Sequence, residues 1–384
     1  LQVRFCEGAH SNLGLLPQKK VCYGLYSTED VDYENVTITG KLDLSKIGLK
    51  TVPYARSAIY FEFYGLEKEL NIVESNITIQ NSVFKEDVDF SNTEFRKDIE
   101  FIGTSFLSRN DFLGANFTRD ADFNHANFTG DADFNHANFA GSTYFGSANF
   151  AGDAYFNHAN FAGSTYFWDA NFARDAYFWD ANFTYSTYFW DANFARDASF
   201  GHANFASYAY FHRANFTGFA HFHRANFTGS TYFGDANFAG DADFNHVNFA
   251  YYTDFKDANF AGFAFFTDAN FTGFAKFKDA NFAGNAFFTA ANFNNLASFD
   301  STEFNKVSFT GTTFTNVSLN ETDFNQMDVE WSTLKDALVF DGPTYIKLIK
   351  NFREMEQFDD ADAAYYQYRQ LSQRNKKWCW TLQS

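Results

Sequence analysis

The tripeptide Ala-Asn-Phe recurs every 11 residues through most of this chain, and no other feature limits the possible folds so strictly. The copies run in step from Ala115 and Ala126 to Ala291, with a single change, Val247 in place of Ala. A second Phe lies between successive copies, so Phe recurs at alternating steps of six and five residues. Neither the helical period of 3.6 nor the strand period of two produces this spacing. We therefore expect a repeat architecture in which each unit buries its Phe only against neighbouring units.

The residues before the second Phe reveal a longer period. They alternate between Asp-Ala and Ser-Thr, as in Asp131-Ala132, Ser142-Thr143, Asp153-Ala154 and Ser164-Thr165. The same pair of residues returns after 22 residues, which is four Phe steps. Each step of five or six residues suits one short strand and a corner. The alternation therefore predicts a coil with four walls, and it does so without using Phe.

The unit seen at Ala137-Asn138-Phe139 resembles the pentapeptide-repeat family, whose consensus places Ala at the inward i−2 site, Asn or Asp at i−1 and Phe or Leu at the inward centre. The resemblance covers about residues 77–334. It implies an all-β solenoid, a right-handed quadrilateral β-helix of stacked repeats, with about twelve coils and a length of roughly 55 Å. This chain departs from the family by an extra residue in every second unit, as at Gly130 and Gly141, which we expect to enlarge two of the four corners.

Three regions follow from this pattern. Residues 1–76 are irregular and are expected to form an N-terminal cap with the first partial coils. Residues 77–334 form the repeat region. Residues 335–384 lose the repeat and predict a helical hairpin that begins near Pro343. Such a pair of helices would cover the open end of the β-helix and block edge-to-edge growth.

The repeat assigns each column of side chains to the inside or the outside of the coil. The structural core is expected to contain Phe128, Phe134, Phe139 and Phe145. Two opposite walls present almost only Asn at the i−1 position, and Asn side chains satisfy one another along such a ladder. We therefore interpret these two walls as structural.

One of the remaining walls, here named the aromatic wall, presents Tyr and Trp. Its members are Tyr144, Tyr166, Trp168, Tyr188, Trp190, Tyr210 and Tyr232. An aligned strip of exposed aromatic side chains on a rigid wall is typical of an interface. The alternative is that aromatic pairs on neighbouring coils only stabilise the sheet. The functional hypothesis is that this wall binds a protein partner, further copies of the chain or a polysaccharide.

No residue pattern indicates catalysis. The sequence contains no recognisable nucleophile and base pair and no phosphate-binding loop, and a flat wall is a poor place to exclude water. Corner columns contain His and Asp, such as His136 and Asp180, but each coil supplies one ligand and Arg213 and Arg224 interrupt the columns. We expect a non-enzymatic scaffold without catalytic residues, metal site or cofactor.

Charge, cysteines and sequons suggest partners and a location. The net charge of −18 disfavours nucleic acid as a partner, because phosphate binding needs clustered Lys and Arg. Cys6 and Cys22 are close enough in sequence for a disulfide, although three reduced thiols are the alternative. Sequons such as Asn35-Val36-Thr37 and Asn316-Val317-Ser318 permit glycosylation. These features favour an extracellular or cell-surface location, with the cytoplasm as the alternative.

Two alternative functions remain open. Some members of the family that this chain resembles mimic duplex DNA in width and charge and occupy the DNA site of type II topoisomerases, and the acidic composition is compatible with that role. The segment Lys376-Lys377-Trp378-Cys379-Trp380 combines basic and interfacial aromatic residues, as juxtamembrane segments do. The chain would then be a soluble ectodomain, with membrane association through residues beyond its C-terminus.

Overall fold

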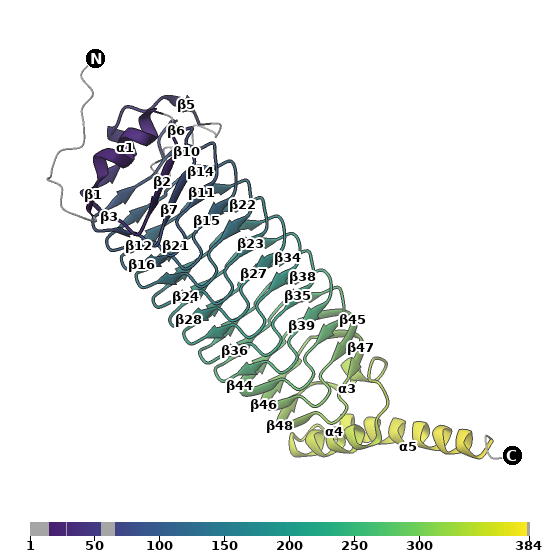
Figure 1. Ribbon diagram of the computed structural model, residues 1–384. Coiled ribbons are helices and arrows are strands. Elements are labelled where there is room, and N and C mark those ends of the chain that lie inside the picture. Colours follow the sequence, from purple (N-terminus) through teal and green to yellow (C-terminus); the bar gives the residue numbers. More distant parts are fainter. Residues whose placement is uncertain (1–14, 28, 55–65, 382–384) are drawn as a thin grey trace. The chain divides into compact units, whose positions relative to one another are not determined.

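The computed structural model describes residues 15–27, 29–54 and 66–381. The chain forms two compact units, Leu1–His221 and Phe222–Ser384. Each unit is a parallel β-solenoid, and the second unit ends in helices (Figure 1).

One coil shows how the four walls arise. The strands β16 (Asn127–Phe128), β17 (Ala132–Asp133), β18 (Asn138–Phe139) and β19 (Thr143–Tyr144) follow one another along the chain. The next strand, β20 (Asn149–Phe150), pairs in parallel with β16 and not with β19. The coil therefore closes after four short strands and 22 residues, as the Asp-Ala and Ser-Thr alternation predicts.

In the first unit, the walls that contain β16 and β17 consist of the following strands. The first Asn wall contains β1 (Leu15–Pro17), β3 (Thr37–Thr39), β8 (Val83–Phe84), β12 (Ser105–Phe106), β16, β20, β24 (Asn171–Phe172), β28 (Asn193–Phe194) and β32 (Asn215–Phe216). The wall that follows it contains β4 (Leu42–Asp43), β9 (Val88–Asp89), β13 (Asn110–Asp111), β17, β21 (Ala154–Tyr155), β25 (Ala176–Tyr177), β29 (Ala198–Ser199) and β33 (Ala220–His221).

The two opposite walls are built in the same way. The second Asn wall contains β5 (Thr51–Pro53), β6 (Glu69–Val73), β10 (Thr93–Phe95), β14 (Asn116–Phe117), β18, β22 (Asn160–Phe161), β26 (Asn182–Phe183) and β30 (Asn204–Phe205). The aromatic wall contains β2 (Val31–Glu34), β7 (Ile77–Gln80), β11 (Ile99–Glu100), β15 (Ala121–Asp122), β19, β23 (Thr165–Tyr166), β27 (Thr187–Tyr188) and β31 (Ala209–Tyr210). All four walls have strands before residue 77, so coils already occur in the region expected to be a cap.

The N-terminal region adds helices and an antiparallel pair to these coils. The helix α1 (Gln18–Ser27) precedes β2, and the 3-10 helix η1 (Leu44–Lys46) follows β4. The strand β5 pairs antiparallel with β6, unlike the strand pairs of the coils, which are parallel. Cys22 is buried in α1, whereas Cys6 lies outside the described residues, so the structure does not test the predicted disulfide.

The interior of the coils is filled by stacked Phe rings. Phe128, Phe134, Phe139 and Phe145 each have 0% of their surface exposed. Phe134 stacks on Phe156 in the next coil with 5.0 Å between ring centroids, and the other three make equivalent stacks. Phe134 also meets Phe145 edge to face at 5.3 Å. Both arrangements are favourable for aromatic pairs, so like rings on successive coils stabilise each other.

The corners explain the alternation of five and six residues. Each five-residue step turns through a residue in the left-handed conformation, for example His136 with φ of 59° and Asp180 with φ of 54°. His and Asp tolerate this conformation better than most residues. Each six-residue step contains the extra residue, often Gly, and a Cβ on Gly152 would lie 2.4 Å from the carbonyl carbon of Gly130 in the preceding coil. The columns of His and Asp are therefore backbone turns.

The second unit is built from coils of the same kind until the extra residue disappears. Its short strands are β34 (Asn226–Phe227), β35 (Thr231–Tyr232), β36 (Asn237–Phe238), β37 (Ala242–Asp243), β38 (Asn248–Phe249), β39 (Thr253–Asp254), β40 (Asn259–Phe260), β41 (Ala264–Phe265), β42 (Asn270–Phe271) and β43 (Ala275–Lys276). The longer strands β44 (Asn281–Phe287), β45 (Asn292–Ser298), β46 (Glu303–Ser308), β47 (Thr313–Ser318) and β48 (Asp323–Asp328) follow. Each longer strand spans two walls, and the register shifts between Phe282 and Asn285, where β46 has lost the extra residue.

Three helices close the end of the second unit: α3 (Trp331–Leu334), α4 (Gly342–Glu354) and α5 (Phe358–Thr381). Asp341 caps α4 by accepting from the backbone N–H of Thr344 at 2.9 Å. Asn351 of α4 binds the last strand as another coil would. Its Oδ1 accepts from the backbone N of Met327 at 3.0 Å, and its Nδ2 donates to the carbonyl of Met327 at 2.8 Å. The helical cap therefore satisfies part of the exposed strand edge.

Candidate functional site

Four tyrosines of the aromatic wall form a continuous stack, here named the Tyr ladder: Tyr144, Tyr166, Tyr188 and Tyr210. Successive ring centroids lie 4.9, 4.9 and 5.0 Å apart, and the rings are within 6° of parallel. Each residue is half-buried because its ring faces contact the rings above and below. The ladder therefore presents ring edges to solvent, and the stacking that stabilises the sheet also makes this surface rigid.

The two predicted Trp residues of this wall are held differently. The Trp168 indole covers Gly146 of the preceding coil, where a Cβ would lie 2.4 Å from Cε2 of the indole. Trp168 is consequently half-buried. Trp190 is 43% exposed, and its ring lies 5.8 Å from that of Tyr188 and 6.5 Å from that of Tyr210. Trp190 is therefore the more available of the two for a partner.

Two exposed tyrosines that sequence reasoning missed enlarge this surface. Tyr185 is 58% exposed and Tyr208 is 48% exposed, and both lie at the corner that leads into the aromatic wall. The Tyr208 ring centroid is 6.0 Å from that of Tyr210. A signal was present in the sequence, since Tyr185 occupies the corner position that holds Gly163 one coil earlier. The exposed aromatic cluster therefore centres on β27 and β31.

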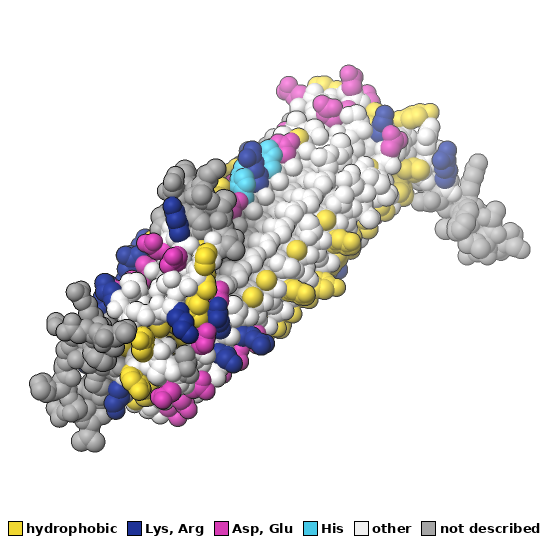
Figure 2. Space-filling view, turned by 90° about the horizontal axis from the view of Figure 1, so that it is seen from above, with side chains coloured by type: hydrophobic (Ala, Val, Ile, Leu, Met, Phe, Trp, Pro, Cys, Tyr) yellow, Lys and Arg dark blue, Asp and Glu magenta, His cyan; other side chains and the backbone are white. Residues whose placement is uncertain are grey.

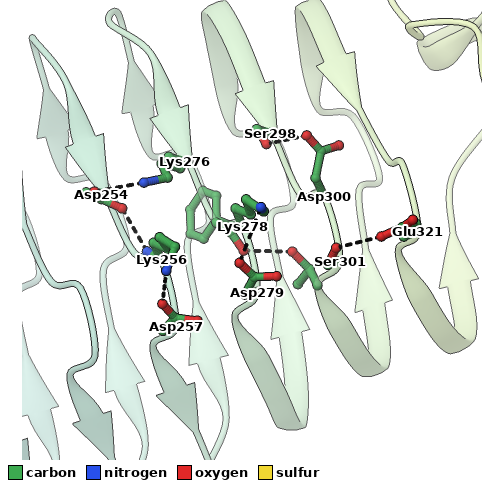
Figure 3. Close-up of polar contacts among 12 residues, drawn as sticks. Asp254, Lys256, Asp257, Lys276, Lys278, Asp279, Ser298, Asp300, Ser301 and Glu321 are labelled. Atoms are coloured by element: carbon green, nitrogen blue, oxygen red, sulfur yellow. Dashed lines mark hydrogen bonds and ion pairs between the residues drawn. The ribbon is translucent and has the colours of Figure 1, made fainter.

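In the second unit the corresponding wall changes from aromatic to charged. Tyr232 is half-buried, and Asp254 faces it in the next coil. Lys276 then donates to Asp254 Oδ2 at 3.3 Å. Figure 3 shows this part of the wall, including the ion pairs Lys256–Asp257 and Lys278–Asp279 and the hydrogen bond from Ser298 to Asp300. Tyr232 thus lies at the start of a charged surface, and the structure places it in a different unit from the Tyr ladder.

Neutral amides dominate the Asn walls, as the sequence predicts. Asn160 donates from Nδ2 to Asn138 Oδ1 at 2.7 Å, and Asn182 donates to Asn160 Oδ1 at 2.7 Å. Figure 2 shows a face that is mainly white, the colour of the backbone and of uncharged polar side chains, with yellow hydrophobic side chains on it and most charged side chains toward its margins. The amides of these ladders already have partners, so the Asn walls are structural.

A groove of 660 Å³ lies on the wall opposite the Tyr ladder, in the first unit. The side chains of Asn135 and Asn157, from successive coils, line its floor, and Trp179 closes one end. Trp179 is 40% exposed, and a Cβ on Gly201 would lie 2.5 Å from its indole. The absence of a side chain at Gly201 therefore lets this indole lie along the next coil.

The side of this groove holds ionisable groups. The rings of His136 and His158 stack with centroids 4.7 Å apart, and His158 Nδ1 lies 3.7 Å from Asp180 Oδ2. Burial, followed by the like charge of Asp111 one coil earlier, raises the pKa of Asp133 to about 6 despite a hydrogen bond from the backbone N of Asn135. The groove thus combines a carboxyl group of raised pKa with two imidazoles.

Within residues 15–27, 29–54 and 66–381, no three His, Cys, Asp or Glu side chains are arranged to hold a metal ion. The corner residues of successive coils point outward from left-handed turns, so each coil contributes a single side chain.

Sequons differ in whether their Asn is available. Asn182 lies in a sequon, but its Nδ2 donates to Asn160 and to Thr184 Oγ1. By contrast, Asn35, Asn316 and Asn320 are exposed. Only sequons of the second kind could accept a glycan without breaking an Asn ladder.

The C-terminal helix has an uneven surface. Ala361 and Ala364 are buried, whereas Tyr365 is 42% exposed. Lys376 to Trp380 fall within α5, in a part whose side chains lie outside the described residues. No helix in the described part of the chain combines the length and apolar character required to cross a membrane.

The comparisons agree with this architecture. A family model described as pentapeptide repeats (9 copies) matches residues 79–127, 123–171, 211–258 and 277–323. A comparison with curated proteins finds no match. Solenoids of this repeat family are generally non-enzymatic scaffolds. The repeated Ala-Asn-Phe unit, the four-walled coil and the family match together place this chain in the pentapeptide-repeat family.

Proposed function

We propose that this protein is a non-enzymatic scaffold that associates with a second copy of itself through the Tyr ladder and the exposed cluster of Tyr185, Trp190 and Tyr208. The observation that carries the proposal is the continuous stack of four tyrosines bordered by three exposed aromatic side chains. Aromatic side chains are enriched in the cores of protein interfaces.

Charge favours a second copy at this surface. The chain carries a net charge of −18, so most approaches between two copies are repulsive. The outward i−1 positions of the ladder in the first unit are uncharged. In the adjoining corner column, Asp191 and Arg213 pair through two hydrogen bonds of 2.8 and 2.5 Å, and Asp169 is exposed. An aromatic centre with a polar rim is the usual anatomy of a protein interface.

The periodicity and the rigidity of the Tyr ladder also favour self-association. Two ladders with the same rung spacing of about 4.8 Å stay in register along their whole length. Stacked rings lose little conformational entropy on binding, because the stack already restricts their rotamers. Four rungs span only about 14 Å, which is a small interface. We therefore expect a dissociation constant in the micromolar range or weaker.

Sedimentation velocity from 1 to 200 µM protein tests the proposal. The wild-type chain should form dimers at the upper concentrations. The double variant Trp190→Ser and Tyr208→Ser should stay monomeric, because both residues are exposed and neither is needed by the core. Trp179→Ser, on the opposite wall, is the matched control and should dimerise normally. A wild-type chain that is monomeric at 200 µM would show that a second copy is not the occupant of this wall.

The proposal includes an extracellular or cell-surface location, supported by the exposed sequons at Asn35, Asn316 and Asn320. Mass spectrometry of the protein isolated from its native source is the direct test. We expect glycan on at least one of these three residues and none on Asn182. Entirely unmodified sequons would remove this support.

A further inference from the structure

The floor of the groove opposite the Tyr ladder holds two amide side chains whose orientation is fixed by the backbone. Asn135 Oδ1 accepts from the backbone N of Asn157 at 2.9 Å, and Asn157 Oδ1 accepts from the backbone N of Trp179 at 3.0 Å. These bonds fix the orientation of both amides. The Asn135 side chain also hydrogen-bonds the carboxyl group of Asp133, whereas within the described residues the Nδ2 group of Asn157 donates to no other residue. The floor therefore presents the oriented and unused N–H₂ group of Asn157 next to the hydrogen-bonded pair of Asp133 and Asn135.

The rest of the lining supplies complementary chemistry. The carboxyl group of Asp133 lies at the N-terminal part of the groove and accepts hydrogen bonds. His136 and His158 add ring nitrogens along one side. The Trp179 indole supplies an apolar surface at the far end. Sites of a few hundred Å³ that combine an aromatic wall with a few convergent polar groups are typical of small-ligand binding.

This combination suits a saccharide. A sugar ring has an apolar face of C–H groups that packs on an aromatic ring, while its hydroxyl groups both donate and accept hydrogen bonds. The amides can donate to such hydroxyls and the carboxylate can accept from them. The net charge of −18 disfavours an anionic sugar, so a neutral one is indicated. The floor amides repeat once per coil, about 4.8 Å apart, which is close to the length of one pyranose ring in an extended chain.

We propose that the groove formed by Asp133, Asn135, Asn157 and Trp179 binds a neutral oligosaccharide that runs along the coil axis. This site lies on the wall opposite the Tyr ladder and does not depend on self-association. Dimerisation through the ladder leaves the groove open, so each proposal can fail without the other.

Isothermal titration calorimetry of the full chain tests the site with neutral hexasaccharides: cellohexaose, maltohexaose and chitohexaose. A hexamer of galacturonic acid serves as the anionic comparison. We expect at least one neutral hexamer to bind, and the anionic hexamer to bind at least tenfold more weakly. Failure of all three neutral hexamers to bind at 1 mM would overturn the proposal, as would preferred binding of the anionic hexamer.

Two variants locate the site. Trp179→Ala removes the aromatic surface, and Asn157→Asp keeps the oxygen that accepts from the backbone N of Trp179 but removes the amide donor. Each should weaken binding at least tenfold. Trp190→Ala, on the aromatic wall, should bind like the wild-type chain. Circular dichroism should show an unchanged β-solenoid for all three variants. Binding that survives both groove variants would place the ligand elsewhere and refute the assignment.

Discussion

Replacing Asp133 by Asn should stabilise the protein at neutral pH and leave it unchanged at acidic pH. Asp133 lies in register with Asp111 one coil earlier, and burial together with this like charge raises the pKa of its carboxyl group from 3.8 to about 6. A raised pKa in the folded state means that folding favours the protonated form. The contribution to stability is therefore fully present below pH 3.8 and is lost as the pH rises through 6.

The size of the effect follows from the same shift. About two pKa units at about 1.4 kcal/mol each give an upper limit of about 3 kcal/mol. The side chain is only half-buried, so solvent screening should reduce this to about 1–2 kcal/mol. Asn keeps the oxygen that accepts from the backbone N of Asn135, at 3.0 Å in the wild-type chain, so the local turn should survive. The gain should then come from the removal of charge alone.

Urea denaturation at pH 4, 5, 6 and 7 measures the difference between the variant and the wild-type chain. Solenoids can unfold in parts, so hydrogen exchange of the amides in residues 127–139 provides a local measure. Asp131→Asn is the control, because it removes the same charge from an exposed corner two residues away. A difference that is equal at all four pH values, or a destabilised variant at pH 7, would refute the electrostatic reasoning.

Three further substitutions test the packing. Phe178→Ala removes a ring stacked at 4.9 and 4.8 Å on its two neighbours. The free energy of unfolding, measured by urea denaturation, should fall by about 3–5 kcal/mol. A much smaller loss would mean that neighbouring side chains fill the cavity, which would contradict this prediction. Gly146→Ala should displace the indole of Trp168 and red-shift its fluorescence with little loss of stability, and an unchanged spectrum would contradict the close contact. Asn351→Leu removes both bonds to the last strand, so light scattering should detect more aggregation than for the wild-type chain.

Much of the architecture was predictable because one coil repeats so closely. The 22-residue alternation at positions such as Asp131 and Ser142 predicts four walls, and parallel pairing of β16 with β20 confirms it. The helical hairpin near Pro343 is also confirmed, as α4 and α5. The face that α5 buries is set by its contacts with α3 and α4, where Ala361 and Ala364 are buried while Tyr365 is exposed.

The candidate site was predictable only in part. The column of Tyr144 to Tyr210 could be aligned from its spacing, but the exposure of Tyr185 and Tyr208 depends on which corner residues turn outward. The groove gave no signal of its own in the sequence. It exists because Asn135 and Asn157 are shorter than Trp179 in the same column, and such a difference in height becomes a hollow only when the coils are stacked.

By itself the sequence determined the coil: its period, its four walls, the Phe interior and the columns that each wall displays. These properties repeat every 22 residues, so each coil specifies the same strands, corners and buried positions as the one before it. The tertiary structure decided what each column does. Trp168 lies over Gly146 while Trp190 is exposed, and the tyrosines turn their faces to one another and only their edges to solvent. The physical reason is that each of these side chains packs against a residue of a neighbouring coil, 20 or 22 positions away, and this packing selects one orientation among several that the local sequence allows.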